Sequence, residues 1–308
     1  MKSFATFILL LQFVLPGRGQ KNNSDTLIVV GEPQQPLNKK KLLWYSAGTA
    51  AGWGASMVGL YSLWYKDYGT GKFHFFDDSK EWLQMDKVGH TMTSYYVGNA
   101  ACNLLYTTGW KRNRCIVWGG LLGTFFLSSV EIFDGYSNGW GFSWSDMGAN
   151  VAGSGLFIGQ EFLWKEQRFT LKFSAHHTGY AIYRPELLGT GGLERILKDY
   201  NGQTYWLSGN LHSFMREDAK FPRWLSISIG YGARGMIGGM ENPFVPVDAF
   251  MPFDRTREWY VSLDADLWRI KTRSKFLKTV FKAIGFIKIP FPTLEFHKNG
   301  LSFYPLYF

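Results

Sequence analysis

The chain has 308 residues, a formal net charge of +9 and an aromatic content of 18%. This length allows two domains, and the charge and aromatic content are unusual for a soluble enzyme. They favour a surface that meets lipid or an anionic polymer. The only two cysteines, Cys102 and Cys115, are too few for a disulfide framework. Both lie in or beside apolar helical segments, so we expect them to be small buried side chains.

The N-terminus has the pattern of a cleaved secretory signal peptide, residues 1–19. Lys2 precedes an apolar core from Phe4 to Leu15, and small residues follow. The apolar run is about 12 residues long, short of the roughly 20 that cross a bilayer, which makes an uncleaved anchor the weaker interpretation. No cysteine follows the run, so a lipoprotein anchor is not expected. Residues 20–41 are polar, basic and proline-containing, which predicts an extended leader.

Hydrophobic patterning predicts four helices between residues 42 and 167. Three of them are long and apolar enough to cross a bilayer or to form the centre of a bundle: Leu42 to Tyr65, Ile116 to Phe133 and Met147 to Trp164. The remaining helix, Trp82 to Tyr106, is second in chain order. It carries ionisable and amide side chains, so one of its faces should be turned away from lipid.

Small residues recur in these helices at spacings of three and four, as at Gly48, Gly52 and Ser56 in the first helix and at Gly148, Ala152, Gly155 and Gly159 in the fourth. That spacing allows helices to pack closely in lipid. A water-soluble bundle uses the same spacing, but the long uncharged runs favour membrane spans. Residues 42–167 are therefore predicted to form a membrane-type four-helix bundle.

After Lys165 the chain changes character. Apolar or aromatic residues alternate with polar ones in about five segments bounded by Gly, Pro and Asn, a pattern that predicts β-strands. In one of them Leu225, Ile227 and Ile229 share a face. The smallest single-chain membrane barrels need about eight strands, so we expect a small sheet packed on the bundle. Residues 168–308 are thus predicted to be β-rich with amphipathic helices, in a fold that is mainly α but of α+β type.

Ionisable residues stand at the ends of the predicted helices. In the segment DKVGH, Asp86 and His90 are four residues apart, which places them on one face of a helix, and Lys87 lies beside them. Glu131 and Asp134 stand near the end of the third helix. A carboxylate four residues before an imidazole can orient or charge it.

The fourth helix adds two more polar residues, Asp146 and Asn150. Ser143 or Ser145 could cap this helix, and Asp146 in its first turn suits the helix dipole. Because short connections join the second, third and fourth helices, the polar end of each should lie at the same end of the bundle. We therefore expect one polar cluster, made of Asp86, Lys87, His90, Glu131, Asp134, Asp146 and Asn150.

The sequence resembles a known family in this region. DKVGHTMTSYY, a mid-chain Glu and FSWSDMGANVAG are similar to the VanZ-like superfamily pattern of Asp-Lys-x-x-His, Glu, and Ser-x-x-Asp-x-x-x-Asn-x-x-Gly, and most similar to its YfiM-like domain of unknown function from bacterial envelopes. The Gln and Arg that VanZ-like proteins carry before the final Asp are absent. The resemblance implies a fold and an envelope location more than a reaction. It marks Asp86, Lys87, His90, Glu131, Asp146, Asn150 and Gly153.

Three interpretations of the cluster stay open. It can be a buried hydrogen-bonded network that fixes the register of the helices. It can be a ligand site or a divalent metal site, for which His90, Glu131 and Asp146 supply mixed nitrogen and oxygen donors. It can also be a catalytic site with Asp86, His90 and Glu131 as candidates, in which Asp86 orients His90 as general base.

We expect a bacterial cell-envelope membrane protein that is a structural or interaction component of a membrane assembly. The alternative is a membrane-embedded lipid-headgroup-binding protein or a hydrolase that uses the Asp/His/Glu cluster. The expected partners are membrane lipid and other envelope proteins, and no nucleic-acid module is visible despite the basic charge. Apolar helices favour the inner membrane, whereas the strands and the terminal Phe308 favour the outer membrane, which is the expected location.

Overall fold

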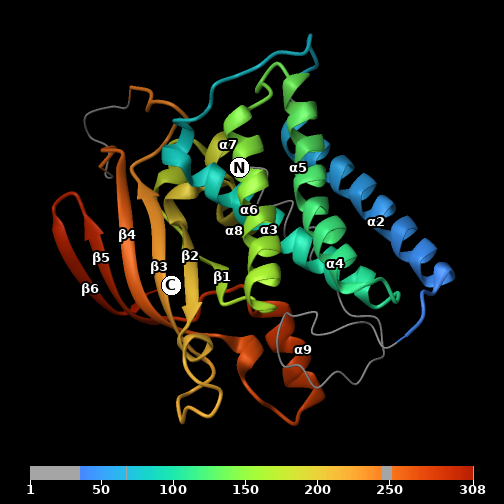
Figure 1. Ribbon diagram of the computed structural model, residues 1–308. Coiled ribbons are helices and arrows are strands. Elements are labelled where there is room, and N and C mark those ends of the chain that lie inside the picture. Colours follow the sequence, from blue (N-terminus) through green and yellow to red (C-terminus); the bar gives the residue numbers. More distant parts are fainter. Residues whose placement is uncertain (1–34, 67, 245–251, 308) are drawn as a thin grey trace. The chain divides into compact units, whose positions relative to one another are not determined.

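The structure is a computed structural model that describes residues 35–66, 68–244 and 252–307 (Figure 1). The predicted signal peptide, most of the predicted leader and Phe308 lie outside the described residues. The chain divides into two compact units. Unit 1 contains residues 80–86 and the described parts of 168–308, and unit 2 contains the described parts of residues 2–79 and 87–167.

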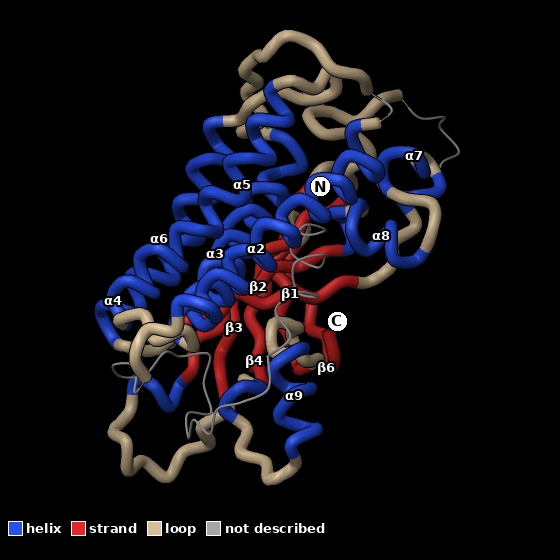
Figure 2. The backbone as a smooth tube through the Cα atoms, turned by 90° about the vertical axis from the view of Figure 1, so that its right-hand side faces the viewer, coloured by secondary structure: helices blue, strands red, loops and turns tan. Residues whose placement is uncertain are grey.

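Unit 2 is helical. Asn38 caps its first long helix, since its side chain accepts a hydrogen bond from the backbone N–H of Lys41 at 2.8 Å. In chain order the helical elements are α2 (Lys39–Leu60), the π-helical turn η1 (Tyr61–Tyr65), α3 (Met85–Tyr106), α4 (Arg112–Arg114), η3 (Cys115–Gly119), α5 (Gly120–Gly135) and α6 (Trp144–Trp164). The helices α3, α5 and α6 run side by side (Figures 1 and 2).

The prediction of a membrane-type four-helix bundle is wrong. The fold is α+β, and an antiparallel sheet of six strands makes up much of unit 1. Within the described residues, one helical stretch, Arg112–Gly135, is long and apolar enough to cross a membrane, a property shared by buried core helices of other proteins. The prediction overestimated the hydrophobicity of the other helices. It rested on the most apolar run within each helix and not on the helix as a whole.

On α6, the glycines that the spacing indicated make no close approach to another helix. A Cβ at Gly148, Gly155 or Gly159 would meet nothing within 4 Å. In contrast, a Cβ at Gly153 would lie 2.1 Å from the carbonyl oxygen of Thr91, and one at Gly123 would lie 2.1 Å from that of Ser94. Gly153 and Gly123 therefore allow α6 and α5 to approach the backbone of α3.

Unit 1 is built on one sheet in which each strand pairs antiparallel with the next in sequence, so the order is β1-β2-β3-β4-β5-β6 (Figure 1). The strands are β1 (Phe169–Ala175), β2 (Gln203–Asn210), β3 (Leu225–Arg234), β4 (Thr256–Ala265), β5 (Phe291–His297) and β6 (Gly300–Tyr307). The short helical elements are η2 (Glu81–Gln84), η4 (Tyr180–Ile182), α7 (Pro185–Leu188), α8 (Gly192–Lys198), η5 (Tyr200–Gly202), η6 (Leu211–Phe214), η7 (Leu267–Arg269) and α9 (Lys275–Ile284).

One face of this sheet is buried although it is polar. Lys172 and Asp264 are fully buried and form an ion pair with a distance of 2.7 Å between Nζ and Oδ2. The Asp264 carboxylate also accepts from Ser208, and Lys288 donates to Ser262 and to two backbone carbonyls. Because these charges are paired and hydrogen-bonded, the buried face can be polar without leaving an isolated ion.

Burial lowers the pKa of Lys288 to about 8, an effect that Asp264 opposes and Lys172 reinforces. Above this pH the folded chain loses the Lys288 proton, whereas the unfolded chain keeps it until the ordinary value of 10.5. The unfolded state then binds more protons, so the free energy of unfolding should rise with pH in this window, by up to roughly 3 kcal/mol.

Denaturant titrations of the wild-type chain and of Lys288→Met at about pH 7.5 and about pH 9.5 measure this effect. The difference in unfolding free energy between the two proteins should shift in favour of the wild type as the pH rises. Parallel pH dependence of the two proteins would contradict it.

A short segment of unit 1 comes from far upstream. Trp82, Leu83 and Gln84 have positive φ angles of 49°, 49° and 66°, a conformation that costs residues other than glycine about 1–2 kcal/mol each. The backbone N–H of Trp82 donates to the carbonyl of Gly239 at 2.9 Å, and the Tyr231 hydroxyl donates to the carbonyl of Leu83. These contacts hold residues 80–86 to unit 1 in a strained turn.

Candidate functional site

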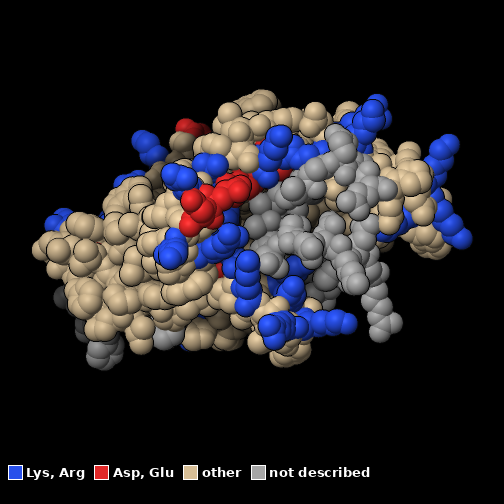
Figure 3. Space-filling view, turned by 60° about the horizontal axis from the view of Figure 1, so that its bottom comes forward, with Lys and Arg blue, Asp and Glu red and all other residues tan. Residues whose placement is uncertain are grey.

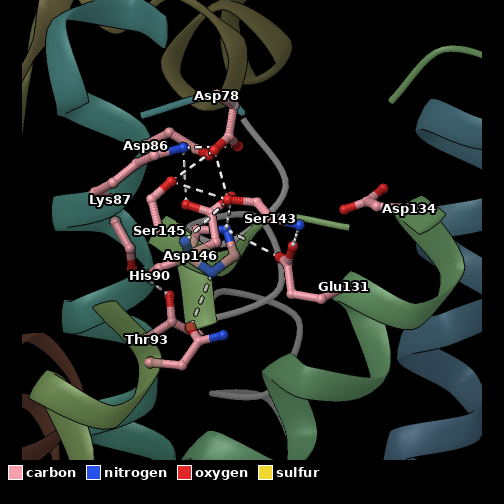
Figure 4. Close-up of polar contacts among 12 residues, drawn as sticks. Asp78, Asp86, Lys87, His90, Thr93, Glu131, Asp134, Ser143, Ser145 and Asp146 are labelled. Atoms are coloured by element: carbon pink, nitrogen blue, oxygen red, sulfur yellow. Dashed lines mark hydrogen bonds and ion pairs between the residues drawn. The ribbon is translucent and has the colours of Figure 1, made fainter. Parts of the chain in front are cut away.

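A cluster of buried polar side chains lies in unit 2, where α3, α5 and α6 meet the loop that precedes α3 (Figure 4). Lys87 and His90 come from α3, Glu131 from α5, and Asp146 and Asn150 from α6. Helical spacing and the short connections between helices predicted that these five residues lie together. The loop and the N-terminus of α6 add Asp78, Ser143 and Ser145 (Figure 4).

Lys87 joins two carboxylates. Its Nζ lies 2.7 Å from Asp78 Oδ2 and 2.9 Å from Asp146 Oδ1. Although burial by itself raises the pKa of Asp78, its hydrogen bond with Asp146 and the ammonium of Lys87 hold that pKa below the ordinary value. Asp78 is therefore ionised at neutral pH, and Lys87 is its counter-ion.

Ser143 is the N-cap of α6, as one of the two predicted caps. Its Oγ accepts a hydrogen bond of 3.0 Å from the backbone N–H of Asp146 and donates to Asp78, while its own backbone N–H donates to Glu131 Oε2 at 3.2 Å. The Ser145 hydroxyl donates to Asp78 at 2.6 Å. One cap thus connects the first turn of α6 to a carboxylate of α5 and to the loop before α3.

His90 lies between acceptors from two helices. Its Nδ1 is 2.9 Å from Asn150 Oδ1, and an oxygen acceptor in this position requires the proton to be on Nδ1. Its Nε2 is 3.8 Å from Glu131 Oε1 and 3.8 Å from Asp146 Oδ2. Asn150 therefore orients the ring so that Nε2 faces two carboxylates.

Two predicted members of the cluster accept hydrogen bonds from tyrosine hydroxyls. Asp134 accepts a hydrogen bond of 2.7 Å from the hydroxyl of Tyr65, and Figure 4 shows its side chain apart from the group around Lys87. Burial first, and then Asp134, raise the pKa of Tyr65. Asp86 stands one turn before His90 on α3, belongs to the segment assigned to unit 1, and accepts from the hydroxyl of Tyr200.

Sequence reasoning missed Asp78 and a group of hydroxyls deeper in unit 2. Ser94 of α3 donates to the carbonyl of Asn150 at 2.6 Å, and Thr124 of α5 donates to the Ser154 hydroxyl of α6 at 2.8 Å. Serine and threonine in otherwise apolar helices were a signal for these contacts, because buried hydroxyls need partners. No spacing rule pointed to Asp78, which lies in a loop.

The charges of the cluster can balance in two ways. Asp78, Glu131 and Asp146 are three carboxyl groups, and Lys87 is one fixed cation. With all three carboxyl groups ionised the formal charge is −2, so one divalent cation or two bound protons would neutralise the group.

Residues 74–158 match the model of a family described as predicted periplasmic lipoprotein (DUF2279). No curated protein and no solved structure matches the chain. The matched range contains every member of the cluster from Asp78 to Asn150, but it covers less than one third of the 308 residues. It supports a bacterial envelope domain of unknown function.

The family match supports the envelope assignment without confirming the VanZ-like or YfiM-like resemblance. The term lipoprotein is part of the family's description and is not a property established for this chain. In this chain Cys102 and Cys115 are both buried, as predicted. Burial raises the pKa of the Cys102 thiol well above its ordinary value, which makes it a poor nucleophile.

Proposed function

We propose that the protein is a structural or interaction component of a membrane assembly in the bacterial cell envelope, with membrane lipid and other envelope proteins as partners. The observation that carries this proposal is the burial of the cluster: the side chains of His90, Glu131 and Asp146 are each at most 5% exposed and are bonded to one another's helices. A closed network of this kind fixes how helices pack.

The compartment is the first part of the proposal to test. We expect the chain to fractionate with the cell envelope, and with the outer membrane in a density gradient. Recovery with the inner membrane would contradict the outer-membrane part of the proposal alone. Recovery outside the envelope would contradict the whole proposal.

His90→Ala tests the structural role of the network. The substitution leaves Asn150 without its imidazole partner in a buried site, so the free energy of unfolding should fall by about 2–3 kcal/mol. The matched control is His74→Ala, because His74 is exposed and belongs to the same unit, and it should change stability by less than about 0.5 kcal/mol. Chemical denaturation measures both.

The second outcome of the same experiment concerns activity in cells. A His90→Ala chain that is as stable and abundant as the wild type, yet reproduces the phenotype of a deletion, would show that His90 acts in chemistry or binding. The structural proposal would then fail. Loss of accumulation together with loss of stability is the result we expect.

A metal site is the second candidate, and the geometry around Nε2 favours it. Zinc and similar ions bind nitrogen and oxygen donors at about 2.0–2.2 Å, so donors in one coordination shell lie a little over 3 Å apart. His90 Nε2 lies 3.8 Å from Glu131 Oε1 and 3.8 Å from Asp146 Oδ2, so these donor atoms would need small movements to bind one ion. Elemental analysis of protein purified without chelators should find about one divalent ion per chain, and the absence of stoichiometric metal would exclude this candidate.

A further inference from the structure

The outward face of β3–β6 is apolar and exposed. Its large side chains are between 38% and 61% exposed: Ile227, Ile229, Trp259, Leu263, Leu294, Phe296, Leu301 and Phe303. We call this set the apolar face. A folded monomer seldom exposes so many neighbouring apolar groups unless they meet a partner or a membrane.

The strand register aligns the apolar face in rows that cross the sheet. One row runs from Tyr231 through Trp259 and Phe296 to Leu301, and the next runs from Ile229 through Val261 and Leu294 to Phe303. A third, shorter row pairs Ile227 with Leu263. Side chains in one row lie side by side on the same face, so the apolar surface is continuous.

The opposite face of the same strands takes all their acidic residues. Glu258, Asp264 and Glu295 are each less than 5% exposed, and they are the acidic residues of β3–β6. Glu258 pairs with Arg234, and the Glu295 carboxylate accepts from the hydroxyl of Tyr304 at 2.6 Å. The apolar face therefore carries no negative charge.

Cations stand at both ends of the apolar face. At one end of the sheet, Arg257 and Lys298 are exposed. Arg257 lies two residues before Trp259, and Lys298 lies two residues after Phe296, the antiparallel partner of Trp259. At the other end, beyond β4, the amphipathic helix α9 presents Lys275, Lys278 and Lys282 and has no acidic residue in its first turn. Figure 3 shows several Lys and Arg side chains on the face in view, with a smaller acidic strip among them.

The helix α9 adds apolar groups beside its lysines. None of its residues is buried, and Phe276 is 74% exposed. It packs on η7 through Trp268, whose Nε1–H donates to the Lys282 carbonyl at 3.3 Å, and η7 directly follows β4. A basic amphipathic helix with unburied aromatic groups is typical of segments that lie in the interface of an anionic membrane.

The height of the apolar face distinguishes one leaflet from a whole bilayer. Three rows on β4 span four residue steps, about 13 Å, whereas the hydrocarbon core of a bilayer is about 30 Å thick. The strands β3 and β4 have 10 residues each, but β5 and β6 have 7 and 8, fewer than the roughly 9–11 that a membrane-crossing strand needs. The surface fits contact with a single leaflet.

We propose that the apolar face and α9 together form a docking surface for an anionic lipid leaflet, with the apolar side chains against acyl chains and the lysines of α9 at the headgroups. The proposal rests on the proposed function in that it needs an envelope protein that reaches a membrane. It goes further because it names the surface and the lipid charge. A second copy of the chain is the competing occupant of the same face.

Flotation of the full chain with vesicles tests the docking surface. We expect binding to vesicles of phosphatidylethanolamine with phosphatidylglycerol and much weaker binding to phosphatidylcholine alone. The double variant Ile229→Ser with Phe303→Ser should weaken binding about tenfold or more, because it removes two large apolar groups from the contact. The control Phe244→Ser changes an equally large side chain that is 92% exposed and outside the sheet, and it should bind like the wild type.

A second variant leaves the sheet unchanged and tests the charge. Replacing Lys275, Lys278 and Lys282 with Gln should weaken binding to the anionic vesicles on the order of 100-fold, and binding by the wild type should fall as salt is added. Far-UV circular dichroism confirms that each variant is folded. Because α9 has no buried residue, this variant remains informative even if the sheet variant is unstable.

Two results would overturn the proposal. In the first, the wild type and both variants bind the vesicles equally or not at all. In the second, analytical ultracentrifugation shows that the Ile229→Ser/Phe303→Ser variant converts a dimer to a monomer while lipid binding is unchanged, which assigns the face to a second copy. Fractionation outside the envelope would contradict the proposed function but would leave vesicle binding intact, so the two failures are distinguishable.

Discussion

Lys87→Met is expected to lower the free energy of unfolding by about 3–5 kcal/mol. The substitution keeps an unbranched side chain that is one atom shorter but removes the counter-ion of Asp78 and Asp146, whose carboxylates lie 2.7 Å and 2.9 Å from the Lys87 Nζ. Two carboxyl groups would then share a buried site without a cation. Folding would then either bury an uncompensated carboxylate or require a proton on one of the two groups, and both lower stability. Chemical denaturation at neutral pH measures the decrease in the free energy of unfolding.

The double variant Lys87→Met/Asp146→Asn distinguishes the loss of charge compensation from the loss of side-chain packing. Removing one carboxylate together with the ammonium should recover part of the loss, since fewer unpaired charges remain. The control is Arg216→Met, whose partner Asp218 is highly exposed, and it should cost less than about 1 kcal/mol. A Lys87→Met chain as stable as the control would show that the network does not hold unit 2 together.

Gly153→Ala is expected to destabilise unit 2 by about 1–3 kcal/mol or more, because the new Cβ would lie 2.1 Å from the Thr91 carbonyl oxygen and 2.9 Å from Ser94 Cβ. Neither atom belongs to a flexible side-chain end, so α6 and α3 would have to separate. That movement would also lengthen the hydrogen bond from Ser94 to the Asn150 carbonyl. Thermal or chemical unfolding of the purified chain measures the effect.

Gly155→Ala is the matched control, two residues away on the same helix. A Cβ there would meet nothing within 4 Å, so alanine should raise stability by about 0.5–1 kcal/mol through its better helix propensity. Opposite signs for the two substitutions are the expected result. Equal effects would contradict the close approach of α6 to α3.

The sequence was a good guide to the local elements and to much of the cluster. Alternation of apolar and polar residues predicted the strands, and the register of Ile227 and Ile229 on one face is present in β3. Helical spacing and short connections brought His90, Glu131 and Asp146 together. These features depend on residues that are neighbours in the chain or on adjacent helices, for which periodicity is a sufficient signal.

What the sequence could not predict depends on long-range geometry. Asp78 enters the cluster from a loop, and Asn150 rather than a residue of the same helix takes the Nδ1 of His90. The environment of the helices was also misjudged, because an apolar run reads the same whether it faces lipid or protein. The glycine contacts of Gly153 follow from how two helices cross, which spacing within one helix does not determine.

The turn at residues 80–86 also bears on how the chain can mature. Tyr231 and Gly239, which bind this turn, are synthesised more than 140 residues after it. Unit 1 can therefore complete its folding only if residues 80–86 are still unpaired with other segments when the strands have been synthesised. Residues 87–167, made in between, can complete their helices first. A fragment that begins at residue 168 would therefore be an incomplete unit. Cutting the chain at that point would separate Tyr231 and Gly239 from the residues 82 and 83 that they bind.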